Sequence, residues 1–547
     1  MVQRSMKLRK HFQRLNEVKD LRLSPPKADM GIMMSRVKSA SRNIMFGYIG
    51  IIITGPLSMV LRSVFIRNLG DTLIGVNDLY AAILSVLALA ELGIGTALHY
   101  SLYAPVAHGK IEKVKSYMRL YKKAYILIGC TIGVIGIALS PFLPYLAKMP
   151  DGGADIAVRD LTLYYFIFLF NTVSTYFVAY KYSLVNAEQK NYIHSNIITI
   201  TRVITVLVQL LVIVFTKNFY LYLLSAAFIE LAQKIFANFY LNRLYPYLTD
   251  KNVEKLSNEE TQIVVTKTKA LVLMKLGDVM RTQTGGIIVS AFINVKLWSF
   301  VVNYNTVINF VTSFVDIIFN NVISSFGNLI ATESKEKQYL MFRIYRFVAC
   351  WIYGFAAVGF FILLTPFVHF WVGSERVLST TVVTLLILDF YFKGDRVVLF
   401  NFKTAAGVFE PDRYLPLIQG IVNLVISLSL VHKYNLIGVF VGTVISGLLA
   451  NLVRPGIIYR ICFGMTAARY YLDWLKYVVI TSVILALSYI ASIIILNKLT
   501  ILSFIIMAFA VTIIFNGIFI GLFWKSEEFR YLFRMVKERL NRSDANG

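Results

Sequence analysis

The sequence predicts an all-α polytopic membrane protein of about 14 transmembrane helices, arranged as two six-helix lobes related by a pseudo-twofold axis, plus a C-terminal helical hairpin. Three observations predict this class. Hydrophobic residues make up 57% of the 547 residues and charged residues only 16%, and the mean hydropathy is +0.65, which is typical of a chain that lies in lipid. Apolar windows of about 20 residues recur along the chain. The third observation is an internal repeat.

The first 42 residues are polar and basic and form a predicted cytoplasmic tail, residues 1–42. Leu8, Phe12 and Leu15 stand at helix-like intervals within it. Two alternatives stay open: a basic amphipathic helix on the inner leaflet, or a solvated flexible tail. The tail lacks the short apolar core of a signal peptide, so the first span is expected to act as the targeting signal.

The apolar windows give an N-lobe at 43–245, a cytoplasmic linker at 246–268, a C-lobe at 269–460, and two further spans with a basic cytoplasmic tail at 461–547. The predicted spans are 44–66, 79–103, 124–147, 161–185, 195–216, 220–242, 271–294, 298–323, 347–371, 378–402, 415–431, 436–453, 477–496 and 501–523.

The formal net charge of +25 comes from Lys and Arg in short polar gaps between apolar runs. Most of these residues fall in the tails and in the loops on the same side, so both termini are predicted to be cytoplasmic. The basic residues do not gather on one polar domain. Nucleic acid is therefore not an expected partner, whereas membrane lipids are.

A repeat relates the loops after the second and eighth spans. AHGKIEKVKSYMRLYKK begins at Ala107, and ATESKEKQYLMFRIYRF begins 224 residues later at Ala331. Six helices separate the copies, so both halves cross the membrane in the same sense, which implies a pseudo-twofold axis along the membrane normal. Two such lobes predict a V-shaped central cavity with access alternating between the two sides. The matched basic pairs are Arg119 with Arg343, Lys122 with Arg346, and Lys181 with Lys403.

Charged residues inside the spans are the first candidates for a substrate path, because a charge in hydrocarbon is costly and tends to face a protein interior or water. Arg62, Arg67 and Arg281 are the candidate cations of the cavity. A guanidinium presents a planar fork of donors that matches phosphate oxygens, so we expect these residues to hold an anionic, phosphate-bearing ligand. The alternative for Arg62 is snorkelling to the outer headgroups.

Five further residues are candidates for lining the cavity or for coupling transport to an ion. They are Glu91, Asp278, Asp316, Tyr304 and Asn305.

Several intramembrane charges could instead be structural, paired with one another on their own helix or with charges of a neighbouring helix. Spacings of three or four residues let side chains meet on a helix. The pairs with this spacing are Glu230 with Lys234, Asp389 with Lys393, and Asp278 with Arg281.

The sequence indicates a transporter and not an enzyme. It contains no phosphate-cradling GxxxxGK[ST] motif, and its longest interior polar gap, 242–270, is too short for an ATPase domain. The histidines are scattered, and Cys130, Cys350 and Cys462 lack metal-ligand or disulfide spacing. No catalytic residue, cofactor or metal site is predicted, and the driving force is expected to be an ion, potential or substrate gradient.

The stretch RSVFIRNLGDTLIGVNDLY, followed by ELGIGTAL and a basic loop, resembles the opening of bacterial polysaccharide-unit flippases of the multidrug/oligosaccharidyl-lipid/polysaccharide exporter superfamily. The resemblance implies two lobes of helices, and transfer of an undecaprenyl-diphosphate-linked oligosaccharide from the inner to the outer leaflet of the bacterial plasma membrane for export of cell-surface polysaccharide. It also implies a cationic central cavity at Arg62, Arg67 and Arg281. Glycosyltransferases and a polymerase of the same pathway are the implied protein partners.

Three alternatives stay open. The first is a lipid II-type flippase, since such proteins also use arginines in the first span. The second is a drug or metabolite antiporter of the same architecture, coupled to protons or sodium through Glu91, Asp316 or Asp389. The third is a membrane scaffold that uses its basic tails to bind partners.

Overall fold

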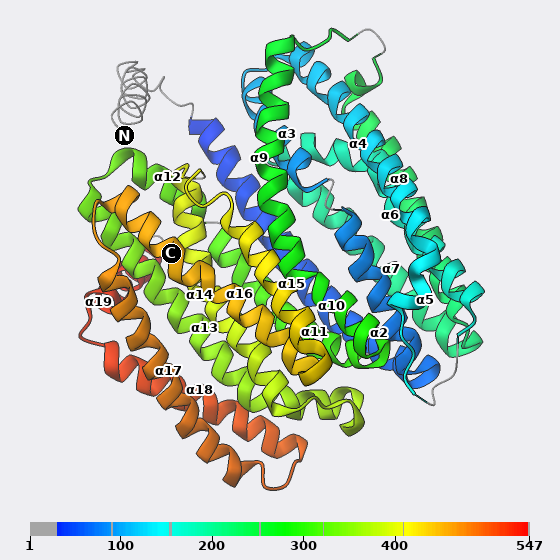
Figure 1. Ribbon diagram of the computed structural model, residues 1–547. Helices are drawn as coiled ribbons and strands as arrows, with labels where there is room; N and C mark the ends of the chain where they lie inside the picture. The colour runs from blue at the N-terminus through cyan, green and yellow to red at the C-terminus, as the bar shows by residue number, and fades with distance from the viewer. Residues whose placement is uncertain are drawn as a thin grey trace.

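The computed structural model describes residues 30–88, 91–151, 156–250, 253–320, 322–408 and 410–544. All regular structure in these ranges is helical (Figure 1), and the all-α prediction is confirmed. The predicted amphipathic stretch around Phe12 lies outside the described residues. The first described helix, α2, begins at Met30, inside the predicted 1–42 tail.

The predicted 246–268 linker differs from the structure, because a short helix occupies Pro246–Thr249 and a long helix begins at Asn258. We call the helices before residue 250 the N-lobe. They are α2 Met30–Leu87, α3 Leu92–Ala107, α4 Ile111–Leu139, η2 Ser140–Phe142, α5 Leu143–Leu146, α6 Val158–Ala187, α7 Asn191–Thr216, α8 Phe219–Leu244 and η3 Pro246–Thr249.

The C-lobe and the C-terminal elements follow. They are α9 Asn258–Thr282, α10 Thr284–Ile288, η4 Val289–Ile293, α11 Val295–Asn320, α12 Val322–Thr332, α13 Lys335–Val372, η5 Ser374–Arg376, α14 Thr380–Ala405, α15 Leu415–Tyr434, α16 Leu436–Ile458, η6 Tyr459–Phe463, α17 Ala468–Ile495, α18 Ile501–Phe523 and α19 Glu527–Asp544.

The chain between the first two predicted spans is helical except at one residue, Gly70. Gly70 has φ 83° and ψ 172°, a conformation that favours glycine because a side chain would be strained there, and the chain turns sharply at this point. The predicted second span, 79–103, differs from the structure. The helix after Gly70 ends at Leu87 and a new helix begins at Leu92, so the span is interrupted beside Glu91.

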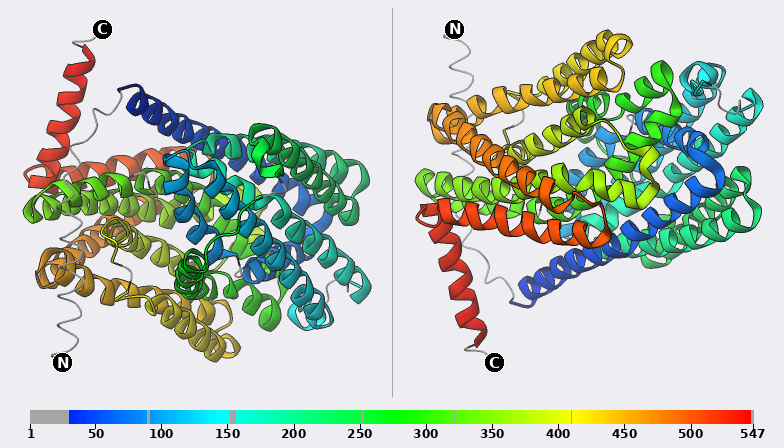
Figure 2. Two further views of the ribbon diagram at one scale, coloured as in Figure 1. Left: turned by 90° about the horizontal axis from the view of Figure 1, so that it is seen from above. Right: turned by 90° about the horizontal axis from the view of Figure 1, so that it is seen from below.

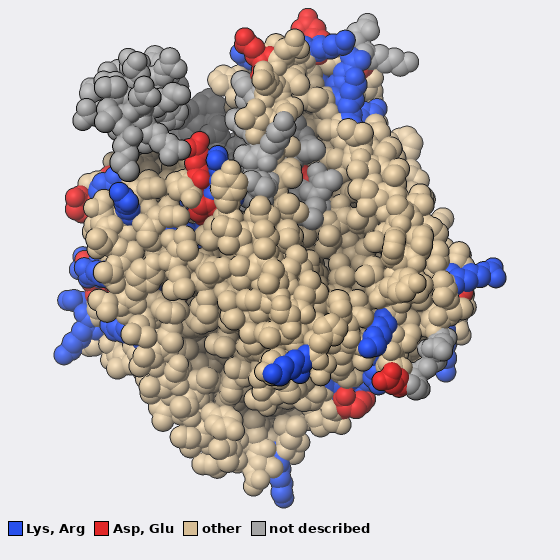
Figure 3. Space-filling model, viewed as in Figure 1, with Lys and Arg blue, Asp and Glu red and all other residues tan. Residues whose placement is uncertain are grey.

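Eleven helices in the described part of the chain are long and apolar enough to cross a membrane. The multi-pass prediction is therefore supported, while the count of 14 is not confirmed by this criterion. The segments below the criterion include α14, which carries Asp389, Lys393, Asp395 and Arg396. Figure 3 shows a wide uncharged belt on one face, between charged side chains at its upper and lower ends. This is the surface expected of a protein embedded in lipid.

The predicted C-terminal hairpin corresponds to α17 and α18, which pack against each other and against α13. Phe347 of α13 and Phe515 and Phe519 of α18 belong to their shared apolar core. Figure 2 shows α19 leaving the bundle at a steep angle to α18. Arg343 of α13 holds the start of α19 through ion pairs with Glu527, at 3.2 Å, and Glu528.

The two lobes contact each other through α2 and α9. Helix α2 packs along α7 of its own lobe and α11 of the C-lobe, and α9 packs against both α3 and α15. Gly75 permits the closest approach of α2, because a Cβ there would lie 2.2 Å from the carbonyl oxygen of Val295.

Candidate functional site: the polar cavity of the N-lobe and the charges between the lobes

Arg62 lies at the contact between the lobes, with its side chain buried. It forms an ion pair with Asp78 at 2.8 Å, and it donates to Asn303 and, at 2.9 Å, to the carbonyl oxygen of Ser299 in α11. Its donors are therefore largely occupied by protein in this conformation. Arg62 does not point outward to the headgroups.

Asp78 was not singled out from the sequence, although a signal was present. Arg62 and Asp78 each lie eight positions from Gly70. A chain that folds back at Gly70 must bring these two positions together. Locating the turn at one glycine would therefore have found the pair.

A second ion pair joins the lobes at the α2 kink. The guanidinium of Arg376, in η5, donates to both carboxylate oxygens of Asp71, at 2.6 and 3.1 Å, and also to the carbonyl oxygen of Val372 at 2.6 Å. The indole of Trp371 donates to the carbonyl oxygen of Met59 at 3.0 Å. These contacts hold the α13–α14 connection against α2.

Arg67 is not brought together with Arg62. Its side chain is exposed on α2, three residues before Gly70. Arg281 lies elsewhere again, inside the C-lobe, between α9, α14 and α16. It forms an ion pair with Asp389 and donates to the carbonyl oxygen of Thr443 at 3.3 Å.

The C-lobe cluster of Arg281, Asp389 and Arg396 carries a net positive charge. Arg396 also pairs with Asp389, at 3.0 Å, so two guanidiniums share one carboxylate. Among the described atoms, Nε of Arg281 and Nη1 of Arg396 are buried without a hydrogen-bond partner. A buried donor without a partner is costly, so this cluster is strained electrostatically.

For two of the predicted charge pairs the structure shows ion pairs between helices, the second structural alternative, in place of the expected pairing along one helix. Asp389 pairs with Arg281 and Arg396, and Lys393 pairs instead with Asp316 of α11, at 3.1 Å. Arg281 likewise does not pair with Asp278, whose side chain is exposed on α9. Lys393 and Arg281 meet carboxylates of neighbouring helices, whereas Arg396 reaches Asp389 from two turns further along α14 itself.

Tyr304 and Asn305 lie on α11 close to the lobe contact. Tyr304 is fully buried, and its hydroxyl accepts a hydrogen bond from the backbone N–H of Leu378 at 3.2 Å. It therefore packs in the core and does not line an open cavity. Asn305 is half-buried.

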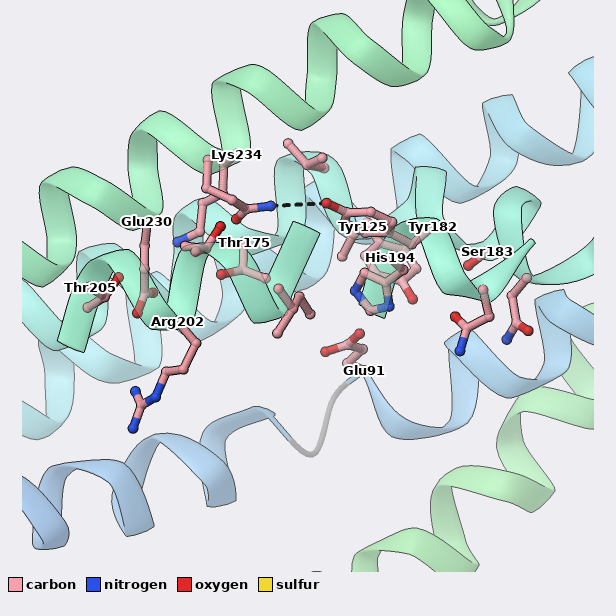
Figure 4. A pocket seen from close by; sticks show the side chains of 17 residues that line it. Glu91, Tyr125, Thr175, Tyr182, Ser183, His194, Arg202, Thr205, Glu230 and Lys234 are labelled. Carbon is pink, nitrogen blue, oxygen red and sulfur yellow. Dashed lines mark hydrogen bonds between the residues drawn. The ribbon is translucent and has the colours of Figure 1, made fainter. Parts of the chain in front are cut away.

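The N-lobe contains a polar cavity of about 510 Å³, within the range of about 300–1,000 Å³ common for ligand sites. Glu91 reaches it from the break between α2 and α3 (Figure 4) and lies close to Tyr125 and Tyr176. The cavity is lined by hydroxyl, amide and aromatic groups. These include Tyr125, Thr175, Tyr182, Ser183, Asn186, Asn191, His194, Thr201, Thr205 and Gln233.

Helices α6 and α7 supply most of this lining. On each helix the lining residues recur at intervals of three or four positions, as in Thr175, Ala179, Tyr182 and Asn186 of α6. Such residues share one face of a helix. The spacing of these polar residues, the polar stripe of α6 and α7, was visible in the sequence, but it was not used to predict a cavity.

Lys234 and Glu230 of α8 are held by the same residue at the edge of the cavity. Lys234 donates to the side-chain and backbone oxygens of Asn171, at 2.6 and 2.7 Å, and to Ser174 at 2.9 Å. Glu230 accepts a hydrogen bond from the amide of Asn171. Both charges are thus engaged by the protein.

Arg202 differs from these residues. It lines the cavity and also an adjoining one of about 190 Å³, and its guanidinium is directed away from Glu91 (Figure 4). It donates to Ser58 of α2 at 3.3 Å, and no carboxylate of the described residues forms an ion pair with it. Arg202 therefore offers an exposed guanidinium at the edge of both cavities, and such a group can bind an anion.

No protein family model matches the sequence, and no curated protein sequence matches it significantly. Solved structures do match its fold. The lipid II flippase MurJ, in an inward closed conformation, is 14% identical with a TM-score of 0.61, covering 88% of this chain and 100% of that chain.

Two transporters of the MOP superfamily match over less of this chain. A multidrug resistance MATE family transporter in an inward-facing conformation is 14% identical with a TM-score of 0.55, covering 75% of this chain and 97% of that chain. A transporter from Pyrococcus furiosus, described as having a binding pocket of reverse polarity, is 14% identical with a TM-score of 0.54. The match covers 78% of this chain and 96% of that chain. The chain therefore has the fold of these transporters.

Proposed function

We propose that this protein is a flippase that moves an undecaprenyl-diphosphate-linked oligosaccharide from the inner to the outer leaflet by alternating access. The observation that carries the proposal is the N-lobe cavity, which combines hydroxyl, amide and aromatic lining with the guanidinium of Arg202. Sugars need many hydrogen-bonding partners, and a diphosphate needs a planar cation. The resemblance of the opening sequence to polysaccharide-unit flippases and the transporter fold support the same proposal.

In the proposed mechanism Arg202 holds the diphosphate, the polar stripe of α6 and α7 holds the sugars, and the prenyl chain stays in lipid. The lobes then part on one side as the contacts of Arg62 with α11 and of Arg376 with Asp71 break. Arg62 is released from Asn303 by that movement and gains free donors for the same anion. Arg67 and Arg281 are the remaining candidates for contacts along the path.

The cellular setting belongs to the same proposal. The protein is placed in the bacterial plasma membrane with both termini cytoplasmic, alongside the glycosyltransferases and polymerase that make and consume its substrate. The match to the lipid II flippase, which covers more of this chain than the multidrug transporter does, supports a lipid II-type precursor as the second candidate. Both candidates share a prenyl diphosphate and a saccharide.

The test is a flipping assay in proteoliposomes that contain the full-length protein and a polyprenyl-diphosphate-linked disaccharide. Flipping is measured as the fraction of sugar that becomes accessible to a membrane-impermeant oxidant. Loss of a charge-assisted hydrogen bond of about 1.5–3 kcal/mol predicts that Arg202→Ala slows flipping by about 10- to 150-fold. Arg202→Lys retains the charge but not the planar fork of donors, so its flipping rate should lie between those of the wild type and Arg202→Ala.

The matched control is Arg159→Ala, which removes an exposed cation at the start of α6 that does not line the cavity. An unchanged rate in Arg202→Ala at equal protein levels contradicts the phosphate-binding role. Efflux of cationic dyes by the wild type, without flipping of the lipid, contradicts the proposal as a whole and favours an antiporter.

A further inference from the structure

A second cavity of about 700 Å³ lies on the opposite face of α6 and shares no lining residue with the first. It is formed by α4, α6, α8 and the segment around η3. Its lining carries five cations, and the one acidic residue among its described lining is Asp250. The cations are Lys115, Arg119, Lys122, Lys123 and Lys181.

Most of this charge is not neutralised by the protein. Asp250 forms an ion pair with Lys115 at 2.7 Å, and Arg119 donates to the backbone carbonyl oxygen of Val253 at 2.9 Å. Among the described residues, no carboxylate lies within ion-pair distance of Lys122, Lys123 or Lys181. The cavity therefore has an excess of positive charge.

Lys181 makes this excess costly. Its side chain is 3% exposed, and its ammonium donates to the side-chain oxygens of Asn238 and Asn242, which are neutral. Lys122 lies near enough to repel it. A buried cation without a counter-charge is unfavourable, so an anion in the cavity would relieve both interactions.

Arg119, Lys122 and Lys181 of this cavity match Arg343, Arg346 and Lys403 in the repeat. In the C-lobe each of these matched cations forms an ion pair. There, Arg343 pairs with Glu527 and Glu528, Arg346 with Asp395 at 3.4 Å, and Lys403 with Asp412.

The N-lobe keeps the three cations as Arg119, Lys122 and Lys181, but it has lost the carboxylates. Val173 stands where the repeat places Asp395, and Lys190 stands where it places Asp412. The matched cations thus pair with protein carboxylates in the C-lobe and with none of the described carboxylates in the N-lobe.

We propose that this cavity binds the phosphate headgroup of an anionic phospholipid of the inner leaflet. The cations supply the charge, and the cavity is flanked by apolar side chains that face lipid. Phe177 and Ile126 line it and are 51% and 36% exposed, so an acyl chain can lie along them while the headgroup meets the lysines. Basic pockets between helices near the cytoplasmic surface suit anionic headgroups.

The experiment measures lipid binding to the purified full-length protein by native mass spectrometry, with phosphatidylglycerol, phosphatidylcholine and inorganic pyrophosphate as separate probes. The variant Lys122→Gln/Lys123→Gln removes two exposed cations and leaves the buried Lys181 in place, so folding is retained. Each basic residue near an anionic lipid surface contributes about a fivefold factor. The double variant should therefore bind phosphatidylglycerol about 30-fold more weakly.

The matched control is Arg159→Gln/Lys217→Gln, which removes two exposed cations of the same lobe outside the cavity and should bind phosphatidylglycerol like the wild type. Phosphatidylcholine should bind weakly to all three proteins. An equal loss of phosphatidylglycerol binding in the control, or no loss in Lys122→Gln/Lys123→Gln, contradicts the proposed site. Pyrophosphate that binds as tightly as phosphatidylglycerol overturns the assignment to a lipid, since a free anion would then suffice.

Discussion

The ion pair between Arg376 and Asp71 is predicted to keep the lobes together at the α2 kink. Its two hydrogen bonds are charge-assisted and its side chains are 14% and 11% exposed, so water screens the pair only weakly. Removing one partner leaves the other poorly solvated, at a cost of about 2–3 kcal/mol. Asp71→Asn should therefore shift the equilibrium toward separated lobes by about 30- to 150-fold.

The separation can be measured as a distance between spin labels. Lys217, after α7, and Lys433, near the end of α15, are exposed and suit labelling as cysteines in a Cys130→Ala background, since Cys350 and Cys462 are buried. The wild type is expected to show one main distance. Asp71→Asn is expected to add a longer one, and the exchanged pair Asp71→Arg/Arg376→Asp should restore the first.

The control is Glu375→Gln. Glu375 also pairs with Arg376, but its side chain is 62% exposed, and exposed pairs are worth about 0–1 kcal/mol. Its distance distribution should match the wild type. If Asp71→Asn and Glu375→Gln give the same distribution as the wild type, the ion pair does not control the separation and the argument from burial is refuted.

Four further predictions concern stability and packing. Asp78→Ala leaves Arg62 buried without its carboxylate and should destabilise the protein by about 3–5 kcal/mol, seen as a lower melting temperature, whereas Arg62→Met/Asp78→Leu should recover most of it. Gly75→Val would place side-chain atoms against the backbone of Val295 and should separate α2 from α11, measured as faster amide hydrogen exchange in both helices; an unchanged exchange rate contradicts this. Ser257→Ala removes the N-cap of α9 and should cost about 1 kcal/mol, measured by hydrogen exchange at residues 258–262. Hydrogen bonds from Lys113 and Ser257 lower the pKa of Glu260, so its stabilising effect on the start of α9 is present at neutral pH and is lost as the pH falls through that lowered pKa; Glu260→Gln should abolish this pH dependence.

The general architecture was predictable because it depends on patterns that repeat along the chain. Apolar windows and the loop repeat predicted helical lobes and the C-terminal hairpin. The break at Glu91 was not predicted, although Glu91, Gly93 and Gly95 stand there and glycine has a low helix propensity. A window of hydropathy averages over these residues and does not reveal where a helix ends within an apolar run.

The candidate site was predicted less well, since partners of buried charges are chosen in three dimensions. Arg62 lies inside the protein, one of the two positions that the sequence left open, and Asp78 and Asn303, which hold it, were missed. Asp389 and Lys393 were expected to pair with each other or with a neighbouring helix, but the sequence did not name the partners, which are Arg281 and Arg396 for Asp389 and Asp316 for Lys393. Arg202 was one charge among many in the sequence, and only the packing of α7 against α2 and α6 shows that it faces a cavity.

The repeat gives this difference a functional meaning. Equivalent basic positions carry protein carboxylates in the C-lobe, at Asp395 and Asp412, and have none within ion-pair distance among the described residues of the N-lobe. Cations that no protein carboxylate neutralises favour the binding of an anion. The proposed lipid site therefore follows from the difference between matched positions of the two halves: where the C-lobe supplies a carboxylate of its own, the N-lobe leaves that place for a phosphate group.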